Sequence, residues 1–330
     1  MKKIILFDTS MGSLNLGDFI IMEAINKQMK KILDKNFIVN LPTHTPIMHS
    51  YQMLRNNVIK NACETADYKF ICGTNLLTKN LKHITLGWNI NSIDAKNYKG
   101  AICIGCGMNS EEPKKVNNYT KKIYKRVLNP DFIHSVRDDR TKKFLESMGF
   151  KAINTGCSTL WGLNKEFCKE IETNKSENVV FTLTDYEKDE EYDQKLIDIL
   201  VENYKNVYFW PQGLQDYEYI MKMKNIEKIT ILEPSLVAYR EILDKENIEY
   251  VGTRLHAGIY AMQHKKRSII IKIDNRSRDM AETYGLNCVE RKEIDKITNM
   301  INSKFETRIN INEENIKLWK NQFEEERNND

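Results

Sequence analysis

Arg254 and His256 lie two positions apart in the segment Val251–Gly258, after an apolar run and at the start of a helical pattern. A guanidinium presents a planar fork of donors that matches carboxylate or phosphate oxygens, and a helix N-terminus adds partial positive charge. Gly252 permits a sharp turn between strand and helix. The helix dipole disfavours imidazolium, whereas a bound phosphate would favour it. The pattern predicts an anion site with an acid–base group; the alternative is a structural histidine.

Residues 8–18 join the first predicted strand to a helix and contain two glycines, Gly12 and Gly17. Asn15 or Asp18 can cap this helix, and the amides at its N-terminus suit an anion or sugar hydroxyls. The glycine spacing fits neither the dinucleotide-binding fingerprint nor a Walker A loop, which excludes both assignments. A plain capped turn is the alternative, and the local pattern does not separate it from a binding site.

Arg137 ends another apolar run and is followed by Asp138 and Asp139. We expect Arg137 to face the ligand edge of its sheet and one of the aspartates to cap the next helix. The alternative is a surface ion pair, which would contribute little stability.

Two further strand ends carry polar groups. Arg276 and Ser277 follow the predicted strand Ser268–Ile273 and open a helix, which brings a guanidinium and a hydroxyl to the same edge. Gln212 lies in Trp210-Pro-Gln-Gly213 after another strand and can hydrogen-bond a substrate, although Pro and Gly there are also ordinary turn residues.

Short apolar runs alternate with helical patterns along the chain, which indicates parallel sheets covered on both faces. The predicted strands are Ile4–Asp8, Phe37–Leu41, Lys69–Cys72, Ala101–Cys106, Phe132–Val136, Ala152–Thr155, Val179–Leu183, Val207–Trp210, Ile229–Leu232, Glu249–Gly252 and Ser268–Ile273. The predicted helices are Asp18–Leu33, Arg140–Met148, Tyr192–Tyr204, Tyr217–Met223, Ser235–Leu243 and His256–Gln263.

The alternation pauses in a polar stretch, residues 163–178, which we interpret as a linker between domains. The fold class predicted is α/β, with two doubly wound, Rossmann-like parallel-sheet domains facing a cleft. The expected domains are residues 1–165 on the acceptor side and 166–310 on the donor side. A C-terminal helix within 311–330 is expected to pack back near the domain junction.

The composition excludes several classes of protein. With 330 residues, 41% of them apolar and 29% charged, the chain can bury two cores. The net charge of +4 is spread among interspersed lysines and acids, which argues against a nucleic-acid partner and suits an anionic substrate or peripheral contact with an anionic membrane. The first apolar run stops at Asp8, too early for a signal peptide, and no run is long enough to span a bilayer, so we expect a cytoplasmic protein.

The seven cysteines are expected to be reduced thiols in that compartment. Cys103 and Cys106 have C-x-x-C spacing inside an apolar strand, where side chains three apart should point to opposite faces. Core thiols are therefore predicted instead of a redox or metal pair. We find no spacing typical of metal ligands, and the sequence does not predict an oligomeric state.

Six separated segments together resemble the polysaccharide pyruvyl transferase family. They are Asn15–Asp18, Ser135–Asp138, Thr155–Cys157, Trp210–Gly213, Gly252–His256 and Asp274–Arg276. They occur in the family's order and span nearly the whole chain. Lys265–Arg267 departs from the Gly-x-Pro turn that such proteins often carry, which affects a connection and not the site.

The resemblance implies a fold like that of the GT-B glycosyltransferases and a phosphoenolpyruvate donor, with no cofactor and no metal. Members attach pyruvate as a cyclic ketal to two sugar hydroxyls during surface or exopolysaccharide biosynthesis. The sequence does not indicate whether a nucleotide or a membrane lipid carries the acceptor. A GT-B glycosyltransferase using a nucleotide sugar and a non-catalytic anion- or glycan-binding relative remain alternatives.

The resemblance and the chemistry that it implies suggest a role for each candidate residue. His256 is the candidate general acid and Asp18 a candidate base. Donor binding is assigned to Arg254, Arg137, Arg276, Ser277 and Gly252, and acceptor binding to Asn15, Gly17 and Gln212.

Overall fold

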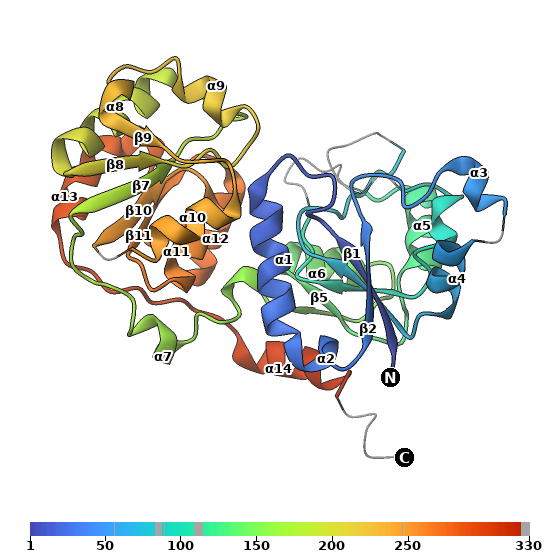
Figure 1. Cartoon of the computed structure of the whole chain (residues 1–330). Helices are drawn as coiled ribbons and strands as arrows, with labels where there is room; N and C mark the ends of the chain where they lie inside the picture. Colours follow the sequence, from blue (N-terminus) through green and yellow to red (C-terminus); the bar gives the residue numbers. More distant parts are fainter. Residues whose placement is uncertain (56, 83–87, 89, 109–114, 246, 325–330) are drawn as a thin grey trace. The chain divides into compact units, whose positions relative to one another are not determined.

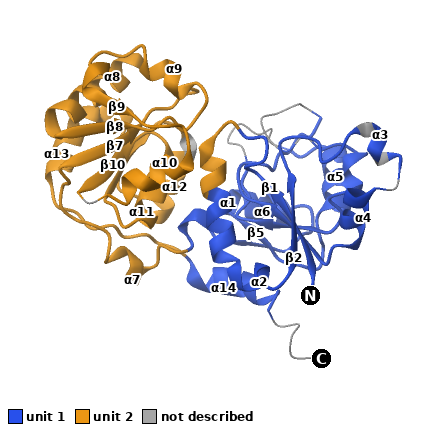
Figure 2. Cartoon of the chain, in the orientation of Figure 1, with its two compact units in different colours: residues 1–13, 21–161, 312–330 blue, residues 14–20, 162–311 orange. Residues whose placement is uncertain are grey.

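The computed structural model describes residues 1–55, 57–82, 88, 90–108, 115–245 and 247–324. It divides the chain into two compact units (Figure 2). The first unit comprises Met1–Ser13, Ile21–Trp161 and Asn312–Asp330, and the second comprises Leu14–Ile20 and Gly162–Ile311. In the described part of the chain, no helix is both long and apolar enough to cross a membrane.

The first unit is built on parallel strands. They are β1 (Lys3–Asp8), β2 (Phe37–Pro42), β3 (Tyr68–Cys72), β4 (Ala101–Ile104), β5 (His134–Val136) and β6 (Ala152–Asn154). One sheet has the order β2-β1-β3-β4, and β5 pairs with β6. A parallel bridge between Cys106 and Val136 joins the end of β4 to β5. The six strands therefore lie side by side in the order β2-β1-β3-β4-β5-β6.

The helices of the first unit cover both faces of these strands. They are the body of α1 (Leu16–Gln28), with α2 (Lys30–Leu33), α3 (Ser50–Met53), α4 (Val58–Thr65), α5 (Asn118–Val127), α6 (Asp139–Glu146) and α14 (Glu313–Asn321). Phe7 and Cys103 point into a core that includes Tyr124 of α5. On the alternate face Phe70 packs against Trp319 of α14, with ring centroids 6.2 Å apart, which fixes the C-terminal helix to this unit.

The second unit contains one six-stranded parallel sheet (Figure 1). Its strands are β7 (Asn178–Thr182), β8 (Asn206–Phe209), β9 (Ile229–Ile231), β10 (Ile248–Gly252), β11 (Ser268–Lys272) and β12 (Cys288–Glu290). Their order, β12-β11-β10-β7-β8-β9, is that of a doubly wound dinucleotide-type sheet. The chain reverses direction across the sheet between β7 and β10, and ligands of such folds sit beyond the carboxyl ends of strands at this switch point.

Helices lie on both faces of this sheet. They are α7 (Lys165–Cys168), α8 (Glu190–Asn203), α9 (Asp216–Ile220), α10 (Leu236–Leu243), α11 (Leu255–Gln263), α12 (Asn275–Tyr284) and α13 (Ile297–Asn302). Phe181 shares a core with Leu196 of α8 and Ile297 of α13. Tyr250, one register step away on the opposite face, lies against Gly258 of α11. This layering buries both faces of the central strands, which explains why their sequences are continuous apolar runs.

The predicted α/β class with two Rossmann-like parallel-sheet domains is confirmed, and every predicted strand is present. Three details of the prediction were wrong. The strand expected to reach Cys106 ends at Ile104, because Gly105 has a positive φ of 58°. The helix expected over residues 18–33 is interrupted at Met29. The edge strand β12 was not predicted, because Val289 is its one buried residue and no apolar run marks it in the sequence.

The two thiols of the C-x-x-C segment are buried core thiols, as predicted. They do not point to opposite faces, since Cys103 and Cys106 share one core cluster and their thiols interact. The left-handed turn at Gly105 ends the strand and returns Cys106 to the same side. That interaction and burial both raise the pKa of the Cys103 thiol, which keeps it protonated.

Candidate functional site

The candidate site of the second unit begins where β7 and β10 end side by side. Gly252 ends β10 opposite Thr182, the last residue of β7. A Cβ at Gly252 would lie 2.6 Å from the Thr182 hydroxyl oxygen and 2.7 Å from its amide nitrogen. Gly252 does not adopt a left-handed conformation. The chain bends at Thr253 before α11 begins, and the glycine allows the two strand ends to approach closely.

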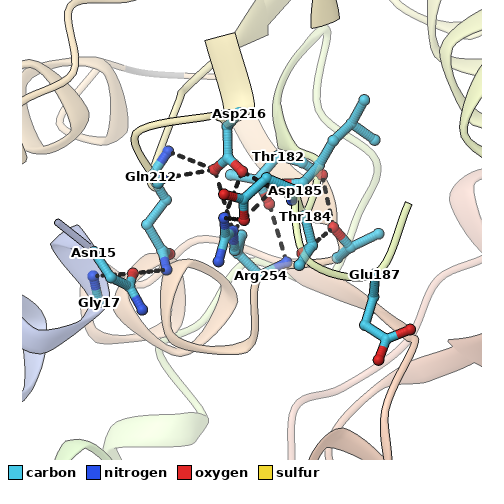
Figure 3. A network of polar contacts seen from close by, with 12 residues as sticks. Asn15, Gly17, Thr182, Thr184, Asp185, Glu187, Gln212, Asp216 and Arg254 are labelled. Atoms are coloured by element: carbon cyan, nitrogen blue, oxygen red, sulfur yellow. Dashed lines mark hydrogen bonds and ion pairs between the residues drawn. The ribbon is translucent and has the colours of Figure 1, made fainter. Parts of the chain in front are cut away.

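Arg254, the N-cap residue of α11, is almost completely buried at this switch point (Figure 3). Its Nε donates to the Leu183 carbonyl oxygen and to Oδ2 of Asp216, each over 3.2 Å. Its Nη2 donates to Oδ1 of Asp185 over 2.8 Å and also to Oδ1 of Asp216. Burial disfavours the guanidinium charge, but Asp216 and the other neighbouring acids keep the pKa of Arg254 above its ordinary value. The cation predicted to bind a ligand is thus already held by two carboxylates.

Asp216 organises this end of the sheet, and the sequence analysis missed it. Its side chain is fully buried at the start of α9. It accepts hydrogen bonds from the amides of Gln212 (3.1 Å), Gly213 (2.7 Å) and Asp185 (3.1 Å), besides those from Arg254. Burial raises the pKa of Asp216, while Arg254 opposes that shift. The signal available in the sequence was an acidic residue at a helix start beside Trp210–Gly213, which has many ordinary explanations.

The predicted acceptor residues Asn15, Gly17 and Gln212 lie together in the second unit. Oδ1 of Asn15 accepts from Gln212 Nε2 over 2.8 Å and from the Gly17 amide over 3.0 Å. The amide of Leu16 donates to the Gln212 carbonyl oxygen over 2.9 Å. The capping role expected of Asn15 is confirmed by its contact with Gly17. Among the described residues, the buried Oε1 of Gln212 has no hydrogen-bond partner.

His256, in the first turn of α11, lies against the same group. A Cβ at Gly17 would be 3.3 Å from Nδ1 of His256 and 2.9 Å from Nε2 of Gln212. The imidazole is 8% exposed. The backbone of Gly17 therefore forms part of the wall beside His256, and any side chain at that position would crowd it.

Three further residues were predicted from the sequence to take part in the site: Asp18, Ser277 and Arg276. Asp18 lies buried in the first turn of α1, with its amide donating to the Asn15 carbonyl oxygen over 3.1 Å. Ser277 serves the capping box of α12: its hydroxyl oxygen accepts from the Asp274 amide over 3.3 Å, and its amide donates to Oδ1 of Asp274 over 2.7 Å. Its role in donor binding stays a prediction. The side chain of Arg276 lies outside the described part of the structure.

Arg137 belongs to the first unit, where it follows β5. It is buried, and its Nε lies 3.6 Å from Oδ2 of Asp138. Asp138 also caps α6 as predicted, since its Oδ1 accepts from the Thr141 amide over 2.7 Å. A Cβ at Gly107 would be 2.7 Å from Cζ of Arg137. This glycine makes room for the guanidinium at the carboxyl edge of the first unit's strands.

The fold defined by these two units is that of the GT-B-like enzymes. Similar solved structures include S. aureus MnaA with UDP (TM-score 0.53, 12% identity, 91% of this chain and 88% of that chain covered). They also include the Methanocaldococcus jannaschii UDP-GlcNAc 2-epimerase with UDP-GlcNAc and UDP (0.52, 15%, 96% and 97%) and the Neisseria meningitidis UDP-GlcNAc 2-epimerase bound to UDP-GlcNAc (0.50, 11%, 98% and 94%). At such low identity the likeness concerns the fold alone.

The sequence match to a family is more specific than this likeness of fold. The polysaccharide pyruvyl transferase model matches residues 15–275, from Asn15 at the start of α1 to Asn275 at the start of α12. The chain belongs to the polysaccharide pyruvyl transferase family, as its sequence segments predicted. The comparison with curated proteins returns no match.

Proposed function

We propose that this protein transfers pyruvate from phosphoenolpyruvate to two hydroxyls of a sugar, as a ketal, during surface or exopolysaccharide biosynthesis in the cytoplasm. Membership of the family supports a transferase acting on a glycan. The observation that carries the proposal is the group formed by Asn15, Gly17, Gln212 and His256. It combines an acid–base side chain with a buried acceptor atom, Gln212 Oε1, whose partner a sugar hydroxyl can supply.

The chemistry requires one proton donor and a binding site for two anionic groups. His256 delivers a proton to the methylene carbon of phosphoenolpyruvate while one sugar hydroxyl attacks the adjacent carbon. The C–O bond to phosphate then breaks, inorganic phosphate leaves, and the second hydroxyl closes the ketal ring. The two hydroxyl protons balance the proton added to carbon and the one carried off by phosphate. Asp18 is the proposed base for the acceptor, and the proposal needs no cofactor or metal.

Arg254 is the proposed donor-binding cation of the second unit, together with Arg276; the donor role of Arg137 in the first unit stays a prediction. Asp216 is fully buried, whereas Asp185 is 18% exposed at the outer side of the guanidinium. A donor carboxylate or phosphate would therefore replace Asp185 and leave the Asp216 contacts intact. Such an exchange keeps the guanidinium oriented while charge develops on the leaving phosphate.

Incubation with phosphoenolpyruvate and a mixed pool of glycan precursors tests the function. We expect phosphate release and a product heavier by one pyruvyl ketal. His256→Gln should lower turnover by ~10²–10⁴, the usual contribution of a general acid. Near-normal turnover in that variant, with phosphoenolpyruvate binding intact, would rule out the acid role.

A glycosyltransferase that uses a nucleotide sugar is the second candidate, since the similar structures include complexes with UDP and UDP-GlcNAc. A thermal-shift comparison separates the two. Stabilisation by nucleotide sugars but not by phosphoenolpyruvate would favour this candidate. Binding of a glycan without phosphate release, across a broad acceptor panel, would favour a non-catalytic relative.

A further inference from the structure

A groove of about 690 Å³ on the first unit is lined by an unusual number of lysines. We call it the lysine groove, after Lys27, Lys30, Lys31, Lys35, Lys317 and Lys320. The first four lie at the end of α1, in α2 and just after it, and the last two lie on α14 (Figure 1). Two segments nearly 300 positions apart thus build one surface.

The charge of this surface is not balanced locally. Among the described residues, the six lysines share the groove lining with two acids, Asp34 and Glu324, which leaves an excess of four positive charges. The whole chain carries a net charge of +4. The formal charges of the rest of the protein therefore sum to about zero, so the groove carries an excess as large as that of the whole chain. Residues 325–330, which follow Glu324 and include three acids and one arginine, lie outside the described residues and are not part of this definition.

Holding these lysines together works against stability. Like charges one helical turn apart repel each other, and only one ion pair, the 3.7 Å contact between Lys30 and Asp34, is present among the groove residues described. Lys320 is fixed by a 3.2 Å hydrogen bond to Gln28 and lies over the Trp161 ring at 5.1 Å. Burial lowers the pKa of Lys320, and Lys31 adds to that shift while Glu324 opposes it. Lys320 is thus held in place by its neighbours, while the other five lysines are exposed around it.

The types of residue indicate the class of partner. Lysine binds phosphates in nucleic-acid sites too, but those sites add side chains that reach base edges or aromatic rings that stack on bases. The remaining groove residues are instead Gln28, Met29, Ile32 and Asn321. Lysine ammonium groups on long flexible stems suit a diffuse layer of negative charge, such as lipid headgroups. We propose that the lysine groove docks the protein on an anionic phospholipid membrane.

Vesicle sedimentation tests the proposal with the full-length protein. The native protein should sediment with vesicles of phosphatidylglycerol and phosphatidylcholine in equal parts and remain in solution with pure phosphatidylcholine. Binding should weaken strongly between about 0.05 and 0.5 M salt, because screening shortens the range of the attraction. Absence of binding to the anionic vesicles at low salt would overturn the proposal.

A fourfold variant locates the binding surface. Lys27→Gln, Lys31→Gln, Lys35→Gln and Lys317→Gln remove exposed charges and leave Lys320 with its contacts in place. Each lysine near an anionic membrane contributes roughly a fivefold gain in partitioning, so the variant should bind roughly several hundredfold more weakly. The matched control replaces Lys222, Lys224, Lys228 and Lys304, which are exposed lysines of the second unit, and should bind as the native protein does.

Two results would overturn the assignment. One is equal loss in the groove variant and the control, which would mean that net charge and not the groove governs binding. The other is tighter, groove-dependent binding to double-stranded DNA than to the vesicles, which would make a nucleic acid the partner. Neither experiment depends on phosphoenolpyruvate or on turnover, so failure of the proposed reaction would not be confused with failure of membrane docking.

Discussion

Nε2 of Gln212 donates a hydrogen bond to Oδ1 of Asn15 over 2.8 Å, and this contact joins residues 197 positions apart. It attaches the start of α1 to the second unit, although most of that helix belongs to the first. Both side chains carry roles in the proposed acceptor site. Their contact is therefore a direct target for a double-mutant cycle.

We expect Asn15→Ala and Gln212→Ala each to lower kcat/KM for pyruvyl transfer, and the double variant to lose little more than the worse single variant. Residues that share one hydrogen bond typically show coupling of roughly 0.5–3 kcal/mol. The control cycle uses Asn178 and Asn206, which are hydrogen-bonded over 2.7 Å at an exposed position of the same unit. Alanine substitutions there should leave kcat/KM unchanged. Additive losses for Asn15 and Gln212 would show that they act separately.

Asp216→Asn should impair both folding and donor binding. The substitution keeps the shape but removes the charge that faces a buried guanidinium, and breaking a buried pair in this way typically costs about 3–5 kcal/mol. We expect a lower melting temperature and a KM for phosphoenolpyruvate raised at least ~10-fold, through loss of Arg254 orientation.

Asp185→Asn is the matched comparison, because that carboxylate contacts the same guanidinium but is partly exposed. It should change the melting temperature much less. If the donor replaces Asp185, the KM of this variant should fall or stay unchanged. A KM raised as much as in Asp216→Asn would contradict the proposed exchange.

The sequence predicted the strands because most of them are short apolar runs, and the central ones, such as β3 and β10, are buried on both faces. It also placed the candidate residues at strand ends, and Asn15, Gln212 and His256 indeed lie together. What the pattern could not predict is the pairing of Arg254 with Asp216. That contact depends on strand order at the switch point, and strand order is not visible in local periodicity.

Buried charges were missed for a related reason. Glu249 at the start of a predicted strand and Arg267 just before another are polar residues typical of strand ends, yet both side chains are completely buried. The lysine groove was missed because its two halves are remote in sequence, and lysine-rich helices are usually solvated faces. Such features become evident only when the tertiary contacts are known.

Glu249→Gln should destabilise the second unit strongly. Oε2 of Glu249 accepts from Nη1 of Arg267 over 2.5 Å, and Oε1 accepts from the Tyr204 hydroxyl over 2.6 Å. Arg267 Nη2 in turn donates to the carbonyl oxygens of Met300 (2.7 Å) and Ile301 (3.0 Å) at the end of α13. Removing the carboxylate leaves a buried cation without its counter-charge, which typically costs about 3–5 kcal/mol. Urea unfolding measures this loss.

The exposed pair Lys265–Glu170 gives a control of the same chemistry, with nitrogen and oxygen 2.6 Å apart. Glu170→Gln should change the free energy of unfolding by less than ~1 kcal/mol, because both side chains are about half exposed to solvent. Equal effects of the two substitutions would mean that the Glu249–Arg267 pair does not stabilise the unit.

His134 should make the first unit sensitive to acid. Its Nδ1 accepts from the Cys103 amide over 3.2 Å and its Nε2 donates to the Asn129 carbonyl oxygen over 2.9 Å, so the neutral ring fills the gap between β4 and β5. Burial lowers its pKa from 6.5 to about 4. Between pH 6.5 and 4 the unfolded chain binds a proton at His134, whereas the folded chain does not. The free energy of unfolding is therefore highest above pH 6.5 and falls as the pH drops towards 4. The loss is about 3 kcal/mol at the lower limit.

Urea unfolding across this range should show a shallower pH dependence for His134→Asn than for the native protein, because asparagine can hydrogen-bond in the gap but does not titrate. Parallel curves for the two proteins would show that another group is responsible for the acid sensitivity.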